Sequence, residues 1–350
     1  MSITAGTAVA VAGCTGSDSR GTATETGTPQ RATPSQSQGN ATVAASSLVT
    51  DSSSVNSLTS PVQPSVSGQP FATLSVRYDD GFNLSGIEGE EVTIYVGEQL
   101  GAAQTATVSD ATVSDDGNTV TFTLAESITL SENQQVVVEY GGVEMPGRPG
   151  EYAVTVTIND TASETGTVTV EETVVEITST FERTIEGWRV QGDAQGSSSF
   201  PNYLEEGGNP GGHLEAVDDV EGGVWYWAAP AQFVGEKSAY AGGELSFDLY
   251  QSTRSSQFNA QDVIIEGPET SLSYDVGGTE THPDTDWTSY SVPLEVADGW
   301  TTGSTSGEAA TEAQFESVLA DLQGLAIRGE YVTGADTGYL DNPTLVPPGE

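Results

Sequence analysis

The sequence predicts an all-β protein with two β-sandwiches in tandem, preceded by a disordered stalk. Three observations support this prediction. Short segments between residues 71 and 346 alternate apolar and polar residues at period two, every aromatic residue lies in that part of the chain, and residues 15–70 are rich in Ser and Thr. A single amphipathic segment in the second half predicts one short helix.

The charge balance excludes ordinary nucleic-acid binding. The 350 residues include 9 Lys and Arg against 51 Asp and Glu, which gives a net charge of −42, whereas a phosphate backbone is bound by clustered Lys and Arg. Lys237 is the only lysine. This composition resembles that of proteins from halophilic archaea, which avoid lysine and carry many surface carboxylates. The alternative is an acidic secreted protein.

Composition also argues against catalysis. One cysteine, Cys14, excludes a disulfide framework, and two histidines, His213 and His282, are too few for most zinc hydrolase sites. The sequence has no Gly-x-Ser-x-Gly nucleophile motif. The many acidic residues offer countless carboxylate pairs, so such pairs carry no specific signal for a glycoside hydrolase. We therefore expect a protein that is not an enzyme.

The N-terminal segment resembles a lipoprotein signal. Residues 8–14 are small and apolar and end in Val-Ala-Gly-Cys, which is similar to a lipobox, so we expect Cys14 to be lipidated and residues 1–14 to be a signal remnant. The first basic residue is Arg20, so the positively charged start of an export signal is missing. A start codon assigned too late would explain this. The alternative is an incidental run of small residues.

Residues 15–70 are predicted to form the stalk. They contain three acidic residues and no aromatic residue, so they offer little surface whose burial would offset the loss of chain entropy. A lipid-anchored domain also needs a spacer through the surface layer.

Residues 71–175 are predicted to form an immunoglobulin-like β-sandwich. Alternating segments at 72–76, 92–96, 120–124 and 154–158, a Val run at 136–138 and a turn at 115–118 give about seven short strands in roughly a hundred residues. Residues 149–161 resemble repeats in haloarchaeal surface proteins. No chemistry is visible here, so we expect a spacer or an adhesive module.

Three N-glycosylation sequons occur, at Asn40, Asn83 and Asn159. Each is a predicted glycan acceptor if the chain is exported, although a Thr-rich chain produces such motifs by chance.

Residues 176–350 are predicted to form the second sandwich. Strands are expected at 224–227, 244–249, 262–266, 288–292 and 325–328. The helix is expected over 311–322, where Phe315, Val318, Leu319 and Leu322 share one face and Thr311 is placed to cap the N-terminus.

Distinctive sequence blocks in this second region lie at 211–215, 225–230, 233–237, 240–249, 315–322, 325–331 and 338–342. In these blocks and their order, residues 180–346 closely resemble the laminin B domain, also called laminin domain IV. This resemblance implies a jelly-roll sandwich similar to galactose-binding and carbohydrate-binding modules, without catalysis. The epidermal-growth-factor-like modules that flank this domain in laminins are missing, so laminin network assembly is not carried over.

The resemblance further implies a structural calcium ion. In related sandwiches, a carboxylate after an early Phe and the Asp of a Leu-Asp-Asn sequence hold calcium, and these positions correspond to Glu182 and Asp341. Calcium accepts carboxylate and carbonyl oxygens in a flexible shell. The alternative is that Asp341 and Asn342 make turn hydrogen bonds.

Sugar binding requires exposed aromatic rings. The loop aromatics Tyr203, Trp300 and Tyr331 are the candidate ligand-binding residues. Trp225 and Trp227 share one side of a strand and are expected in the core, as is Trp188. His213 is expected to be structural, and His282 to be solvated in a loop.

Together these features predict a non-catalytic protein at the cell surface, lipid-anchored or secreted. Its second module is expected to bind surface glycans or other envelope or matrix proteins, and it meets the membrane only through a lipid anchor. The alternative is a structural surface-layer component without a specific ligand. A hydrolase or hydrolase accessory protein is the least favoured function.

The first testable prediction concerns salt. Lowering the salt from about 1 M to about 0.1 M lengthens the Debye length from ~3 to ~10 Å. Repulsion among the carboxylates is then less screened, so the melting temperature should fall, and calorimetry across this range measures it. A melting temperature independent of salt would contradict adaptation to high salt.

Overall fold

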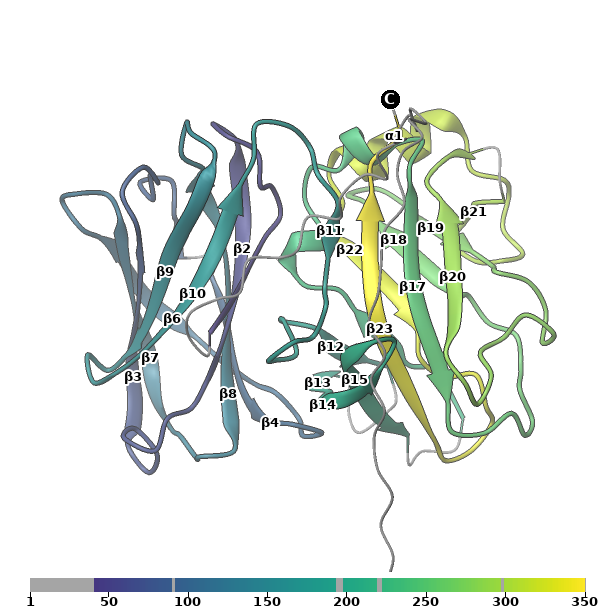
Figure 1. Cartoon of the computed structure of the whole chain (residues 1–350), viewed down its shortest axis with the longest axis horizontal. Coiled ribbons are helices and arrows are strands. Elements are labelled where there is room, and N and C mark those ends of the chain that lie inside the picture. Colours follow the sequence, from purple (N-terminus) through teal and green to yellow (C-terminus); the bar gives the residue numbers. More distant parts are fainter. Residues whose placement is uncertain (1–40, 90–91, 193–197, 219–221, 297–298, 350) are drawn as a thin grey trace, which may run out of the picture. The chain divides into compact units, whose positions relative to one another are not determined.

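The computed structural model describes residues 41–89, 92–192, 198–218, 222–296 and 299–349, which belong to one compact unit. These residues form two β-sandwiches, as predicted (Figure 1). Among them, no helix has the length and hydropathy of a membrane span. Cys14 and Asn40 lie outside the described residues, so their predicted modifications stay predictions.

The first sandwich consists of two five-stranded antiparallel sheets. One sheet has the order β1 (Thr42–Ala45), β2 (Ser53–Pro61), β8 (Gln134–Glu144), β4 (Thr93–Glu98), β5 (Gln104–Ala106). The other has the order β10 (Ala162–Val170), β9 (Gly150–Ile158), β3 (Pro70–Tyr78), β7 (Thr119–Thr129), β6 (Val108–Val113). The inward residues of the two sheets form one apolar core, which confirms the immunoglobulin-like sandwich.

The predicted stalk is wrong from residue 41 onward. β1 and β2 belong to the first sheet, where β2 pairs with β1 on one edge and β8 on the other. Ser and Thr side chains of β2 are buried, and Asn56 donates from Nδ2 to the hydroxyl of Tyr78 at 2.6 Å. A strand paired on both edges draws its stability from partners elsewhere in the chain, so a segment without aromatic residues folds here.

The second sandwich consists of a six-stranded sheet and a seven-stranded sheet. The first has the order β14 (Asn202–Gly208), β15 (Gly211–Asp218), β23 (Asp336–Val346), β17 (Glu244–Gln251), β20 (Thr288–Pro293), with β11 (Ile177–Thr178) pairing with β23. The second has the order β13 (Ser198–Ser199), β12 (Arg189–Gln191), β16 (Tyr226–Ala228), β22 (Gly324–Arg328), β18 (Val263–Glu266), β19 (Ser271–Tyr274), β21 (Thr301–Thr302).

The helices of the second sandwich are short. The α-helix α1 (Glu312–Ala320) begins after Thr311, whose hydroxyl accepts from the backbone N–H of Gln314 in a capping box. Phe315, Val318 and Leu319 are buried, so the predicted helix and its cap are confirmed. Two single-turn helices, η2 (Ala231–Phe233) and η3 (Ser238–Tyr240), complete the described set.

Indole rings dominate the core of the second sandwich. Trp188, Trp225, Trp227 and Trp300 are all at most 1% exposed, and the rings of Trp225 and Trp227 meet edge to face at 5.1 Å. Gly329 packs directly on Trp225, since a Cβ there would lie 1.8 Å from the indole. The prediction that Trp188, Trp225 and Trp227 are core residues is confirmed.

The two sandwiches share a hydrogen-bonded junction. The backbone N–H of Leu100 donates to the Phe200 carbonyl at 2.9 Å, and the N–H of Phe200 donates to the Gly101 carbonyl at 3.1 Å. The only lysine, Lys237, is buried and donates from Nζ to the carbonyls of Ser46 and Val234, each at 2.6 Å. Burial lowers the pKa of Lys237 to about 7.

A buried ion pair lies at the centre of the second sandwich. Arg328 donates from Nη1 to Oδ1 of Asp262 at 3.2 Å, from Nη2 to the Phe258 carbonyl at 2.6 Å and from Nε to the Glu330 carbonyl at 2.5 Å. The guanidinium carbon lies 4.2 Å from the ring centroid of Tyr331. Burial raises the pKa of Asp262 to about 6 against the opposing effect of Arg328.

His282 lies beside this pair and not in solvent. It is 3% exposed, and its ring centroid is 5.0 Å from that of Tyr331. Burial, followed by the charge of Arg328, lowers the pKa of His282 to about 4. The prediction of a solvated histidine is therefore wrong, because the segment before Pro283 folds inward onto the aromatic ring.

Replacing Asp262 tests how much this ion pair contributes to the free energy of unfolding. Asp262→Asn leaves the guanidinium buried without its countercharge, so the free energy of unfolding should fall by about 3–5 kcal/mol. The control is Arg254→Gln, which removes a pair whose side chains are 44% and 48% exposed and should cost less than about 1 kcal/mol. Denaturant unfolding at constant high salt measures both. Equal effects would show that burial of the pair contributes nothing.

Candidate functional site

The outer face of the sheet β14-β15-β23-β17-β20 carries aromatic and polar side chains. Register fixes this arrangement, because Leu214, Leu340 and Leu249 are cross-strand neighbours and all face the core. The adjacent positions Tyr339 and Tyr250 pair with each other and face outward, since successive side chains alternate across a strand.

Four rings gather on this outer face. The rings of Tyr250 and Tyr339 stack at 4.5 Å with an interplanar angle of 11°, and Trp287 meets Tyr250 at 5.8 Å. His213 lies 5.5 Å from Trp287 and 5.6 Å from Tyr339. The two tyrosines and the tryptophan are half-buried, so part of each remains accessible. These four residues are called the aromatic face below.

Polar groups border the aromatic face. Glu215 accepts from Nδ2 of Asn202 at 3.0 Å and pairs across the strands with Tyr339. Burial and the neighbouring Glu215 raise the pKa of Tyr339 to about 12. Burial lowers the pKa of His213, so the imidazole is neutral at pH 7. The border therefore offers carboxylate and amide groups at fixed positions.

Trp287 is held in place by the hairpin between β14 and β15. Its Nε1 donates to the Gly207 carbonyl at 3.0 Å. Gly207 has a φ of +100°, and a Cβ there would lie 3.2 Å from the His213 ring. The hairpin thus covers the histidine edge and orients the indole.

Asp341 lies at the end of this face, and its carboxylate holds a turn. Its oxygens accept backbone N–H groups of Asn209 and Asn342, and Asn342 donates from Nδ2 to the Asn209 carbonyl at 2.7 Å. Asn342 has a φ of +49°, a left-handed conformation that Asn tolerates. These contacts are the turn hydrogen bonds that the sequence offered as the alternative to calcium.

Glu182 is the other residue of the predicted calcium site. It is exposed and lines a cleft at the junction of the sandwiches. Within the described ranges, no three His, Cys, Asp or Glu side chains cluster in a way that would hold a metal ion. Both oxygens of Asp341 already accept N–H groups of the turn, and calcium binding by Glu182 and Asp341 stays a prediction that rests on the resemblance.

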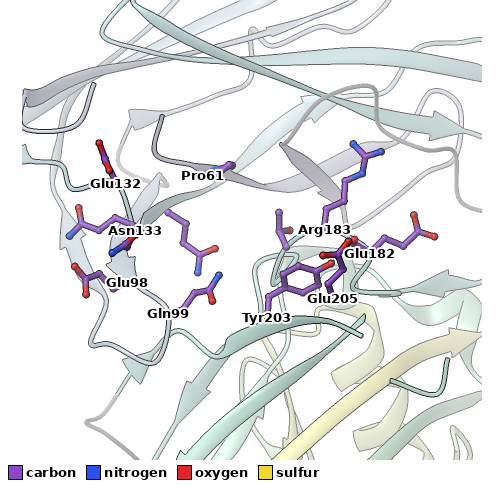
Figure 2. Close-up of a pocket in the computed structure, with 12 residues that line it drawn as sticks. Pro61, Glu98, Gln99, Glu132, Asn133, Glu182, Arg183, Tyr203 and Glu205 are labelled. Atoms are coloured by element: carbon purple, nitrogen blue, oxygen red, sulfur yellow. The ribbon is translucent and has the colours of Figure 1, made fainter. Parts of the chain in front are cut away.

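The cleft is polar and has a volume of about 780 Å³ (Figure 2). Its lining comes from both sandwiches and comprises Pro61, Glu98, Gln99, Glu132, Asn133, Gln134, Gln135, Glu182, Arg183, Thr184, Tyr203 and Glu205. The hydroxyl of Tyr203 donates to the Glu182 carbonyl at 2.6 Å. We call this space the junction cleft.

Of the three aromatics predicted to bind a ligand, only Tyr203 is accessible. Trp300 is 1% exposed and Tyr331 is fully buried, so the prediction of surface rings is wrong for both. Trp300 packs on Phe315 of α1 and Tyr274 of β19, and Tyr331 covers Arg328. Segments without regular structure here fold inward and supply the core.

The two described sequons differ in their surroundings. Asn83 is exposed and donates from Nδ2 to Glu144 at 2.6 Å. Asn159 donates from Nδ2 to the Pro70 carbonyl at 2.7 Å and accepts N–H groups of Ala72 and Thr73, so its side chain fastens a turn to β3. Glycosylation at both sites stays a prediction.

The sequence reasoning missed Tyr250, Trp287 and Tyr339. A signal was present, because Tyr250 follows buried Leu249 and Tyr339 precedes buried Leu340, which places both rings outward in their strands. Their proximity depends on the pairing of β17 with β23, which a single sequence does not reveal.

The family comparison matches residues 226–346 to the model described as Laminin B (Domain IV). The C-terminal sandwich is laminin-B-like. Human laminin subunit gamma-1 is 28% identical over 175 residues, which cover 49% of this chain and 10% of that subunit. Human laminin subunit gamma-2 is 27% identical over 182 residues, covering 50% and 14%. The chain thus spans about a tenth of the length of the laminin subunits that it matches.

Solved structures with similar folds include the L4b domain of human laminin alpha-2, at 16% identity and a TM-score of 0.40, which covers 50% of this chain and 99% of that one. The solution structure of CtCBM11 has 15% identity and a TM-score of 0.31, with coverage of 51% and 92%. The predicted resemblance of the second module to laminin B domains is confirmed by the family match and the laminin relatives.

A substitution at Asp341 separates its turn role from calcium binding. Asp341→Ala frees two backbone donors, so the free energy of unfolding should fall by about 2–4 kcal/mol. Because both oxygens already accept N–H groups, the loss should be the same with calcium and with chelator. The control is the unaltered chain under both conditions. If the chelator destabilises that chain and leaves the variant unchanged, Asp341 holds calcium as the resemblance implies.

Proposed function

We propose that this protein is a surface-exposed binding protein whose laminin-B-like module binds glycans on the aromatic face. The observation behind this proposal is the clustering of Tyr250, Trp287 and Tyr339 as half-accessible rings on one sheet face. The face of an aromatic ring carries partial negative charge, so it attracts the polarised C–H groups of a pyranose.

The border of the face supports this proposal. Hydroxyl groups on a sugar both donate and accept hydrogen bonds, and Glu215 and Asn202 offer a carboxylate and an amide beside Tyr339. Rings backed by a rigid sheet are preorganised, so little conformational entropy is lost on binding. The high negative charge of the chain favours neutral glycans over sulfated or uronic-acid glycans.

The laminin relatives support an extracellular setting. We propose the same setting here, with lipidation at Cys14 as the anchor, and the calcium that the resemblance implies is tested by the Asp341→Ala experiment above. A structural surface-layer component without a ligand is the alternative, and it differs in predicting no specific glycan binding.

Ring removal tests the proposal. A glycan array probed with the full chain in about 1 M salt, where carboxylate repulsion is screened, should show binding to neutral oligosaccharides. Trp287→Ala and Tyr250→Ala should each weaken that binding about tenfold or more, by analogy with nucleic-acid bases, whose stacking on one aromatic side chain contributes about 1–3 kcal/mol.

The matched control is Tyr152→Ala, which removes a half-buried ring of the first sandwich and should leave binding unchanged. Circular dichroism of each variant confirms that it is folded. Absence of binding by the folded, unaltered chain would favour the structural surface-layer function, and equal losses in all three variants would place the site off the aromatic face.

A further inference from the structure

The junction cleft has a floor as well as a rim. Gln135 lies at the start of β8, pairs with Pro61 on β2 and Gly97 on β4, and is 7% exposed. It belongs to the cleft lining. Glu98, Gln99 and Glu132, which Figure 2 labels in the same lining, are exposed. The cleft therefore combines an accessible rim with a buried amide.

The buried amide of Gln135 has an unused donor. Its Nε2 has no hydrogen-bond partner in the structure. Buried polar groups are nearly always paired, and each exception calls for an explanation. An acceptor atom on a bound molecule would satisfy this donor.

The rim of the cleft carries mainly hydrogen-bond acceptors. Glu98, Glu132, Glu182 and Glu205 supply carboxylates, with Arg183 as the one cation of the lining. Ionised carboxylates accept hydrogen bonds and donate none. The negative potential of Glu205 and Glu182 also contributes to the raised pKa of Tyr203, after burial. A ligand must therefore present donors to the rim and an acceptor to the floor.

Ligand classes can be compared by the hydrogen-bond donors, acceptors and charges that they would bring to the cleft. A polyamine or a lysine side chain offers only donors, so it would leave Gln135 Nε2 unsatisfied. A sulfated or uronic-acid glycan brings like charge next to four carboxylates. Hydroxyl groups donate and accept at once, and the half-buried ring of Tyr203 offers one apolar surface for a sugar ring.

We propose that the junction cleft is a second binding site, specific for neutral saccharides, in which Gln135 donates to a sugar oxygen and the rim carboxylates accept from sugar hydroxyls. The two sandwiches contribute to the site together. The junction cleft includes none of the four rings of the aromatic face, so this proposal can be tested independently of the function proposed for that face.

Calorimetric titration of the full chain tests this site, with cellotetraose, mannotetraose and chitotetraose as probes. The measurements use the Trp287→Ala background, so that binding at the aromatic face is suppressed. One of the neutral probes should bind, and Gln135→Met should weaken that binding about tenfold or more. Because Nε2 has no partner in the free protein, the melting temperature should stay the same.

Two controls make the result decisive. Gln99→Met removes an exposed amide of the same cleft and should change affinity less than about twofold. Gln135→Glu keeps the shape but replaces the donor by an acceptor, so it should abolish binding. Unchanged affinity in both Gln135 variants, absence of binding by all three neutral probes, or displacement of the saccharide by spermine at equal ionic strength would each overturn the proposal. Loss of all binding in the Trp287→Ala chain would overturn this site while supporting the aromatic face.

Discussion

The buried guanidinium of Arg328 is the constraint on which the C-terminal sandwich depends. A charge in the interior is tolerated only when its hydrogen bonds and its countercharge are supplied. Here Asp262 and Phe258 supply them from the loop before β18, and Glu330 supplies them from the segment after β22. Satisfying one side chain therefore fixes this loop to the end of β22. The inward packing of Tyr331 and His282 follows from this arrangement.

The location of the tryptophans explains where a binding surface is left. The four large indoles fill the space between the two sheets, so loops that carry Trp300 and Tyr331 contribute to stability instead of to recognition. The outer face of the sheet then receives the remaining rings by strand alternation, together with Glu215 and Asn202. Core residues and candidate binding residues thus lie on the same strands, at alternate positions that face opposite sides of the sheet.

The junction shows how a small-residue segment becomes part of a folded unit. Gly187 approaches Ser57 so closely that a Cβ would lie 2.7 Å from its hydroxyl. Lys237 adds a buried amine that bonds to the Ser46 carbonyl. Arg189 lies 4.3 Å from the ring of Tyr95 and 3.6 Å from Glu139. The small side chain of Ser57 in β2 allows the close approach of Gly187.

The all-β class, most strand positions, the capped helix after Thr311 and the laminin-B-like blocks could be predicted from the sequence, because these depend on local periodicity and on residue order. The core positions of Trp188, Trp225 and Trp227 could be predicted in the same way. The strands β1 and β2, the burial of Trp300, Tyr331 and His282, and the meeting of Tyr250, Trp287, Tyr339 and His213 emerge only in the folded chain. These outcomes depend on pairing between strands far apart in the chain, such as β17 with β23 and β2 with β8, and composition and local pattern contain no information about which strands pair.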